Sequence, residues 1–175
     1  METPFRFSTE QVAKADREEV LREVIGRQFM RLEIEPNDPE NVRVGLVVHR
    51  VQSVVVAYFN TSPMKYIRSP QQAREGDIDF TLSQGLLNGF RYFDQKQEIQ
   101  LAANDAILLS HTGYGTIDIM HEKRELPYAS LRVDGTLLRA AVKDLDDRKA
   151  HLFRADSAPL RLAGRYIRAV LQDDA

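Results

Sequence analysis

The chain has 175 residues, of which 43% are hydrophobic and 29% charged, and this composition is ordinary for one globular domain. Its net charge of −2 excludes the strong positive field with which a domain attracts nucleic acid or an anionic membrane surface. The absence of cysteine excludes disulfides, thiolate metal sites and cysteine nucleophiles, so we expect a cytoplasmic protein. No stretch is apolar for long enough to span a bilayer, and no membrane partner is expected.

The N-terminal zone, residues 1–31, is predicted to be helical, with the helix itself over about 9–27. Ser8 and Gln11 have the spacing of a capping box at the start of this helix. Apolar residues then recur at intervals of three and four, which is the period of a helix with one buried face. We expect the helix to end at Gly26, because glycine is favoured directly after a helix.

Residues 32–133 form the second zone and carry the pattern of β-strands. From Val42 to His49 apolar side chains alternate with others, whereas Ser53 to Asn60 is apolar enough to be buried on both faces. Turn residues then separate short candidate strands at 64–68, 78–83, 86–93, 97–101, 105–110, 116–120 and 128–133. Many short strands at regular spacing indicate a sandwich or barrel instead of alternating strands and helices.

The C-terminal zone, residues 134–175, is predicted to return to helix, first over 135–145 and then over 157–172. The second helix has arginines on one side and an apolar stripe on the other. The stripe consists of Leu160, Ala163, Ile167, Val170 and Leu171. It is either a homodimer face or the surface by which the helix packs on its own barrel, and the sequence leaves both open. Because no repeat or linker divides the chain, residues 1–175 are expected to form one domain.

The sequence predicts neither a metal site nor a catalytic centre. The histidines, His49, His111, His121 and His151, show none of the short spacings at which paired imidazoles bind a metal, although distant ones could still converge. Ser110 and His111 are adjacent, and adjacent side chains of a strand point to opposite faces, so a nucleophilic pair is not expected. No phosphate-binding or dinucleotide-binding glycine pattern occurs either, so no cofactor is predicted.

A small-molecule pocket is the kind of site that the residues favour. Segments 64–93 and 105–120 place aromatic and polar side chains at strand positions, and ligand pockets are mostly apolar with a few convergent polar groups. The candidate ligand-binding residues are Tyr66, Arg68, Phe80, Gln84, Phe90, Tyr92, Ser110, His111 and Tyr114. For each of them the competing interpretation is that its side chain only fills the barrel.

Three stretches of the chain carry framework motifs in a familiar order. They are the run LREVIGRQF (Leu21–Phe29), the step Arg68-Ser69-Pro70 with Arg74, and the turn and strand from Ala103 to Ser110. In this order they resemble the N-terminal regulatory domain of AraC-family transcription regulators, in the subfamily whose members begin with such an R-E-V-V-G-R-x-F segment. The resemblance covers nearly the whole chain.

The chain departs from the family pattern at three places. Asn104 replaces the usual glycine of a Gly-Asp turn, and asparagine fills such a turn because it tolerates the left-handed conformation. Asp94-Gln95-Lys96 replaces a Gly-Arg hairpin, and His111 to Tyr114 stands where Arg-Pro-Tyr is usual, so the role of that arginine is not carried over. We expect 97–101 and 105–109 to be paired strands joined by the Asn104 turn.

The resemblance implies a mainly β fold with flanking helices, in which a cupin-like double-stranded β-barrel follows an N-terminal helix and precedes C-terminal helices. It also implies a bacterial regulator that binds a small-molecule effector, forms a homodimer and reaches DNA only through a C-terminal domain with two helix-turn-helix units. That domain is absent from these 175 residues, so the chain is either part of a longer regulator or a stand-alone protein. The alternatives are a cupin-type metalloenzyme with scattered histidine ligands and an oligomerisation domain without a ligand.

Overall fold

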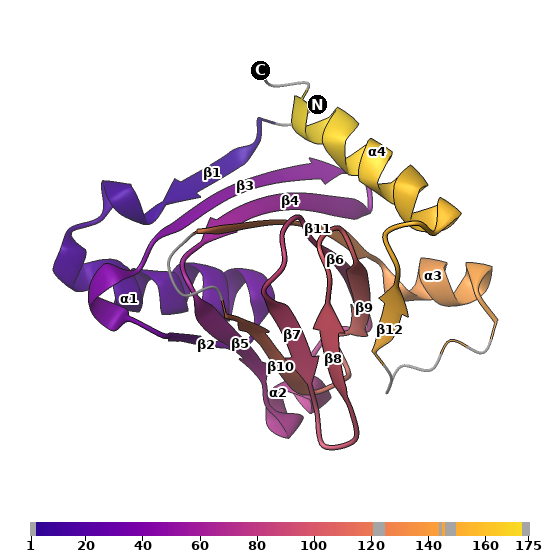
Figure 1. Cartoon of the computed structure of the whole chain (residues 1–175), viewed down its shortest axis with the longest axis horizontal. Coiled ribbons are helices and arrows are strands. Elements are labelled where there is room, and N and C mark those ends of the chain that lie inside the picture. Colours follow the sequence, from indigo (N-terminus) through magenta and orange to yellow (C-terminus); the bar gives the residue numbers. More distant parts are fainter. Residues whose placement is uncertain (1–2, 121–124, 144, 146–149, 173–175) are drawn as a thin grey trace.

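The chain folds into two antiparallel sheets that face each other, with helices on the outside (Figure 1). The computed structural model describes residues 3–120, 125–143, 145 and 150–172. Within them, the larger sheet has the strand order β1 (Phe5–Ser8), β3 (Val44–Val51), β4 (Val54–Thr61), β11 (Leu126–Val133), β6 (Phe80–Gly85), β9 (Ala106–Ser110) and β12 (His151–Phe153). The smaller sheet has the order β2 (Glu33–Pro36), β5 (Met64–Arg68), β10 (Gly115–Ile119), β7 (Phe90–Phe93) and β8 (Glu98–Leu101). This architecture confirms the predicted mainly β fold with flanking helices.

The core lies between the two sheets and takes alternate side chains from each of them. Phe59 of β4 and Tyr128 of β11 stack with their ring centroids 4.5 Å apart. Phe90 of β7 meets Tyr128 edge-on from the smaller sheet, at a centroid distance of 5.6 Å. These rings join the sheets at their middle, where stacked and edge-on aromatic pairs add to the stabilisation from apolar burial.

The N-terminal helix forms as predicted, although it starts later and runs further. The short turns η1 (Thr9–Gln11) and η2 (Lys14–Asp16) precede α1 (Arg17–Leu21), which continues into the wide turns of η3 (Arg22–Met30). The Ser8 hydroxyl accepts from the Glu10 N–H at 3.2 Å, so Ser8 caps a single short turn instead of forming the expected capping box with Gln11.

The expected helix end at Gly26 is wrong. Gly26 is buried inside η3, and its carbonyl accepts from the N–H groups of both Arg31 and Leu32. The helix therefore closes on the Gly26 carbonyl, and Arg31, with φ at 51°, ends it in the left-handed region. Leu21 and Ile25 are fully buried and attach this helix to the barrel.

The turn at Asn104 joins the two sheets to each other. β8 pairs with β7 in the smaller sheet, whereas β9 pairs with β6 and β12 in the larger one, so the expected pairing of the two strands around this turn is wrong. Asn104 has φ at 65°, which confirms that asparagine fills the left-handed position. The buried Asp105 carboxylate fixes the corner, because it accepts from the Ala102 N–H at 3.1 Å and from the Arg154 guanidinium at 2.8 Å.

Several elements fall outside the sequence expectations, among them strand β1 in the N-terminal zone, where only helix is predicted. Helix α2 (Pro70–Glu75) begins with a complete capping box, in which the Ser69 hydroxyl accepts from the Gln72 N–H at 3.2 Å and the Gln72 side chain accepts from the Ser69 N–H at 2.8 Å. β12 adds a strand to the C-terminal zone, where only helix is predicted. The remaining short elements are η4 (Pro39–Asn41) and α3 (Gly135–Ala141), which ends before the predicted 145.

Helix α4 (Ala158–Gln172) lies across the outer face of the larger sheet (Figure 1). Leu160 and Ile167 are each 2% exposed. Ile167 and Val170 pack with Val56 of β4 and Ala129 of β11 on that outer face. The apolar stripe of this helix therefore covers its own sheet. None of the described helices is long and apolar enough to cross a membrane.

The residues predicted to form a dimer face on this helix are wholly or partly buried within the chain. Ile167 and Val170 pack against the chain's own sheet, Leu160 is buried, and Ala163 is half-buried. The side chain of Leu171 lies outside the described residues. A homodimer, and a contribution of this helix to it, stay predictions.

Truncation of Ile167 tests this packing. Ile167→Ala should lower the free energy of unfolding by about 2–4 kcal/mol, because a buried isoleucine loses its contacts and leaves a cavity. Leu162→Ala, on the same helix but 70% exposed, should change it by less than about 0.5 kcal/mol. Urea unfolding measures both. An Ile167→Ala effect that grows with protein dilution would place the stripe in a subunit interface instead.

Candidate ligand-binding site

A cavity of about 90 Å³ lies between the two sheets, and a smaller inner space of about 20 Å³ adjoins it. Both are lined by Met30, Tyr66, Ser83, Tyr92 and Ile117. On this measure one water molecule takes roughly 10–15 Å³, so the 90 Å³ of the main cavity has room for about six to nine of them. The cavity therefore has the size for a small organic molecule.

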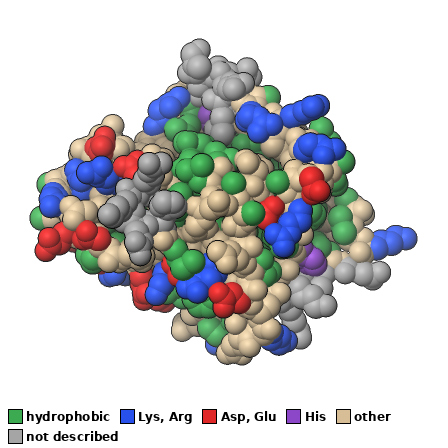
Figure 2. Space-filling view, in the orientation of Figure 1, with side chains coloured by type: hydrophobic (Ala, Val, Ile, Leu, Met, Phe, Trp, Pro, Cys, Tyr) green, Lys and Arg blue, Asp and Glu red, His purple; other side chains and the backbone are tan. Residues whose placement is uncertain are grey.

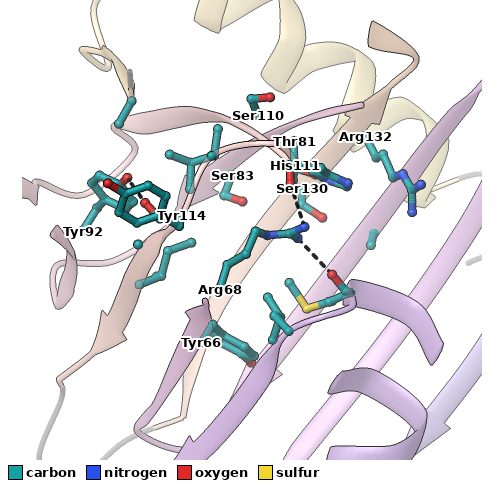
Figure 3. Close-up of a pocket in the computed structure, with 18 of the residues that line it drawn as sticks. Tyr66, Arg68, Thr81, Ser83, Tyr92, Ser110, His111, Tyr114, Ser130 and Arg132 are labelled. Carbon is teal, nitrogen blue, oxygen red and sulfur yellow. Dashed lines mark hydrogen bonds between the residues drawn. The ribbon is translucent and has the colours of Figure 1, made fainter. Parts of the chain in front are cut away.

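The walls are mostly apolar, with polar side chains gathered in one part. Phe59 of β4, Leu109 of β9 and Ile117 of β10 are among the apolar residues. The polar lining residues are Arg68 of β5, Thr81 and Ser83 of β6, Ser130 and Arg132 of β11, and Ser110 and His111 at the end of β9 (Figure 3). Such a composition is typical of sites that hold an organic ligand by burial and orient it by a few polar contacts.

The structure places most of the predicted ligand-binding residues at this cavity. Six of the nine line it, namely Tyr66, Arg68, Tyr92, Ser110, His111 and Tyr114. Phe90 lines only the inner space. The structure thus places these side chains at the cavity, whereas their contact with a ligand stays a prediction.

Phe80 and Gln84 do not line the cavity, which corrects their selection. Side chains of a strand alternate between its faces, and on β6 the inward ones are Thr81 and Ser83. Phe80 lies on the other face under the Arg139 guanidinium of α3, 5.1 Å from ring centroid to Cζ. Gln84 donates to the Asn104 carbonyl at 3.0 Å on that outer side. Helices cover the outer face of the sheet, so both faces of β6 are shielded from solvent. The hydrophobicity of its residues therefore does not show which face lines the cavity.

A network of charged and polar side chains closes the polar part of the wall. Asp77 accepts from the Arg132 guanidinium at 2.5 Å and from the His111 Nδ1 at 2.6 Å. Asp79 accepts from the Nε of Arg132 at 2.8 Å. The other ring nitrogen of His111 lies 2.7 Å from the Thr81 hydroxyl. These bonds connect four parts of the chain: the segment before β6, β6 itself, the end of β9, and β11.

His111 is neutral in this network. Its burial, reinforced by the positive charge of Arg68, lowers its pKa to about 4, although Asp77 acts in the opposite direction. Nδ1 then carries the proton and donates to the Asp77 carboxylate, and Nε2 accepts from Thr81. Burial alone would raise the pKa of Asp77, but the neighbouring charges of His111 when protonated and of Arg132 hold it below its usual value.

The guanidinium of Arg68 differs from that of Arg132 because it is bonded to backbone. It donates to the His111 carbonyl at 3.1 Å and to the Met30 carbonyl at 3.0 Å, and Figure 3 shows both bonds. Burial is the main cause that lowers the pKa of Arg68 from its ordinary value, and an arginine stays charged at neutral pH even so. Among the described residues no carboxylate lies within 4.0 Å of it.

Tyr92 and Tyr114 lie at the part of the cavity away from His111 and Arg132, whereas Tyr66 lies beside Arg68 (Figure 3). The Tyr92 hydroxyl donates to the Asp94 carboxylate at 3.0 Å. Gly115 makes room for this ring, since a Cβ there would lie 2.7 Å from the Tyr92 Oη. Tyr114 is 38% exposed and stands at the border between cavity and solvent. Tyr66 lies deep inside, where burial raises its pKa to about 12.

The cavity holds no arrangement typical of metal or nucleophilic chemistry in the described part of the chain. No three acidic or histidine side chains there are grouped as metal ligands. Both ring nitrogens of His111 are engaged, and His121 lies outside the described residues. The Ser110 hydroxyl lies 2.8 Å from that of Thr112. Ser110 and His111 both reach the cavity wall because the strand ends at Ser110, but the histidine is bonded to Thr81 instead of to this serine.

One solved structure shares this fold over nearly the whole chain, and two others are similar at lower TM-scores. The AraC-like transcriptional activator CuxR shares it with a TM-score of 0.77 at 12% identity, over 98% of this chain and 61% of that one. A cupin 2 conserved barrel domain protein from Rhodopseudomonas palustris is similar with a TM-score of 0.40 at 12% identity, over 79% of this chain and 88% of that one. A cupin-2 domain protein from Rhodospirillum rubrum has a TM-score of 0.38 at 12% identity, over 81% and 88%.

The match to CuxR shows that this chain shares the fold of part of an AraC-like activator, as the resemblance to AraC-family regulatory domains implies. The alignment leaves more than a third of the CuxR chain without a counterpart, because it covers 61% of it. No protein-family model and no protein of curated function matches the sequence. At this identity the likeness establishes the fold alone.

The neutral state of His111 predicts a pH dependence of stability. The folded pKa of about 4 lies below the unfolded value near 6.5, so between these values the unfolded chain binds more protons and stability falls as the pH falls. The loss from this histidine between pH 7 and pH 5 should be about 2 kcal/mol. Urea unfolding of the wild type and of His111→Gln at both pH values measures it. Equal losses in the two proteins would contradict a buried neutral His111.

Proposed function

We propose that this chain is the effector-sensing part of an AraC-type transcription regulator and is not an enzyme. It binds a small, mostly apolar molecule in the cavity between its sheets. It acts in the cytoplasm as a homodimer and controls a helix-turn-helix domain that lies outside these residues. The observation that carries the proposal is a mostly apolar cavity, with its polar side chains in one part, inside a fold shared with an AraC-like activator.

A physical connection between the cavity wall and the outside of the barrel supports a sensing role. Asp77 and Asp79 hold the wall through His111 and Arg132, and Asp79 also accepts from the Gly135 N–H at the start of α3, at 3.4 Å. Arg139 of α3 donates to the Ile78 carbonyl at 3.2 Å. A ligand that binds one position of this segment better than another shifts the population of the two, and α3 moves with the segment.

Binding of a ligand to the native state should raise the melting temperature. At about 100 times its Kd a ligand adds about 2.7 kcal/mol, which for a chain of this size is a shift of roughly 5–10 °C. A thermal-shift screen with aromatic acids, aliphatic acids, alcohols and sugars measures this. Ser83→Phe, which fills the cavity from β6, should abolish the shift, whereas Ser83→Ala should keep one.

The screen also separates the proposal from an oligomerisation domain without a ligand. If no compound shifts the melting temperature, or if Ser83→Phe responds like the wild type, the cavity is not the binding site. Circular dichroism and the melting temperature without ligand show whether Ser83→Phe is folded.

A cupin-type metalloenzyme is the rival from another class. Elemental analysis of protein purified without chelators tests it, because an enzyme of this kind holds a stoichiometric transition metal. One iron, zinc or manganese per chain, lost on substitution of His49 or His111, would contradict the regulator proposal.

A further inference from the structure

The cavity wall carries more positive than negative charge among the described residues. Its two lining cations are Arg68 and Arg132. Arg132 is matched, because Asp77 and Asp79 accept from it at 2.5 and 2.8 Å. Asp77 is shared with His111 and also lies 3.9 Å from the exposed Arg31. The carboxylates of Asp77 and Asp79 thus already interact with two guanidinium groups, those of Arg132 and Arg31. No described carboxylate forms an ion pair with Arg68.

Arg68 keeps donors for a ligand. A guanidinium has five N–H groups, and the recorded bonds of Arg68 to the Met30 and His111 carbonyls use two different nitrogens. Backbone carbonyls carry no net charge, and the charge of Asp77 acts on Arg68 only from a distance, so no described carboxylate is bonded to this half-buried guanidinium beside an apolar space. Burying a charge without a partner is costly, and an anion that enters the cavity removes that cost.

Two hydroxyl groups line the cavity from the larger sheet, whereas Arg68 comes from the smaller one. Ser83 of β6 and Ser130 of β11 are directly opposite in the strand register, and both line the cavity. Among the described residues neither hydroxyl has a recorded protein partner. They supply neutral hydrogen-bond donors for an oxygen that the guanidinium does not reach.

We infer that the effector is an apolar monocarboxylate whose carboxylate binds Arg68 and whose hydrocarbon part fills the space between Phe59, Tyr92 and Ile117. The inference rests on the proposed ligand-binding function of the cavity. One cation without a bonded carboxylate suits one negative charge, whereas a dianion such as a phosphate monoester would bring a second charge without a partner. A sugar would bury many hydroxyls against a mostly apolar wall, where they would lose their hydrogen bonds to water.

The competing explanation is that Arg68 only braces the end of η3 and the turn after β9, through the Met30 and His111 carbonyls. In that case a ligand gains nothing from a negative charge. Matched acids and amides of the same shape distinguish the two explanations on the wild-type protein, without any substitution.

The experiment is isothermal titration of the wild-type chain with trans-cinnamate, cinnamamide and cinnamyl alcohol, and with octanoate and octanamide. Because hydrogen bonds to a charged group are among the stronger ones, the better acid should bind about 10- to 100-fold more tightly than its amide. Phenyl phosphate should bind more weakly than the better carboxylate.

Three arginine variants extend the test. Arg68→Gln should weaken the acid to the affinity of its amide and leave the amide unchanged, and Arg68→Lys should restore part of the difference. Arg165→Gln on the exposed side of α4 is the matched control and should bind like the wild type. Circular dichroism establishes whether each variant is folded.

Each outcome is decisive. Equal affinities of acid and amide in the wild type, or an acid that binds Arg68→Gln as tightly as the wild type, overturn the carboxylate inference while the effector function stands. Tighter binding of phenyl phosphate overturns the single-charge account. If no compound of the panel binds in the cavity, the proposed function fails together with the inference. Should Arg68→Gln not fold, the wild-type acid and amide pairs and Arg68→Lys still decide.

Discussion

The pairing of Asp77 and Asp79 with Arg132 and His111 is the interaction on which this end of the barrel depends. The two aspartates precede β6, the arginine lies in β11, and the histidine follows β9. The carboxylates neutralise Arg132, whereas burial and the charge of Arg68 keep His111 neutral. Polar groups can therefore line an otherwise apolar cavity without an unpaired charge at these two positions. Loss of one carboxylate would leave a half-buried guanidinium with one partner instead of two, which is more destabilising than loss of an exposed ion pair.

The segment from Asp77 to Asp79 also contacts helix α3 on the outside of the barrel. Gly135, the first residue of α3, approaches it so closely that a Cβ would come within 1.7 Å of the Ile78 carbonyl oxygen. The cavity wall and α3 therefore share one short stretch of backbone, and neither can move far without the other. On the far side of the larger sheet, α4 buries Ile167 against Val56 and Ala129 and protects the outer face.

Much of the fold follows from local patterns in the sequence. The alternation from Val42 to His49 predicts β3, and the Asn104 turn has the left-handed backbone expected for it. Pairing partners do not follow, because they depend on contacts between distant segments. The strands on either side of Asn104 are adjacent in the chain but belong to different sheets. Gly26 shows the same limit, since its carbonyl closes a helix that continues past it.

Some residues of the site could likewise be predicted from the sequence, and others could not. Tyr66, Arg68 and Tyr92 could be selected from sequence because they are aromatic or charged residues in strongly patterned strands. Thr81 and Ser83 could not be selected, because both faces of β6 are covered by other parts of the chain. The larger apolar side chains of this strand face outwards, as Phe80 does under Arg139. The roles of Asp77 and Asp79 were equally hidden in a turn-like segment, where a capping function explains an aspartate without any partner.

A crystal structure of the chain with the tightest-binding acid of the cinnamate and octanoate pairs tests the central claim most directly. The claim is that the Asp77–Asp79 network leaves Arg68 as the cation that a ligand must satisfy. The account predicts a carboxylate within hydrogen-bond distance of the Arg68 guanidinium, with the hydrocarbon part beside Tyr92 and Ile117 and with Arg132 still bound by its two aspartates. A ligand whose carboxylate lies away from Arg68, or outside the cavity, would contradict it.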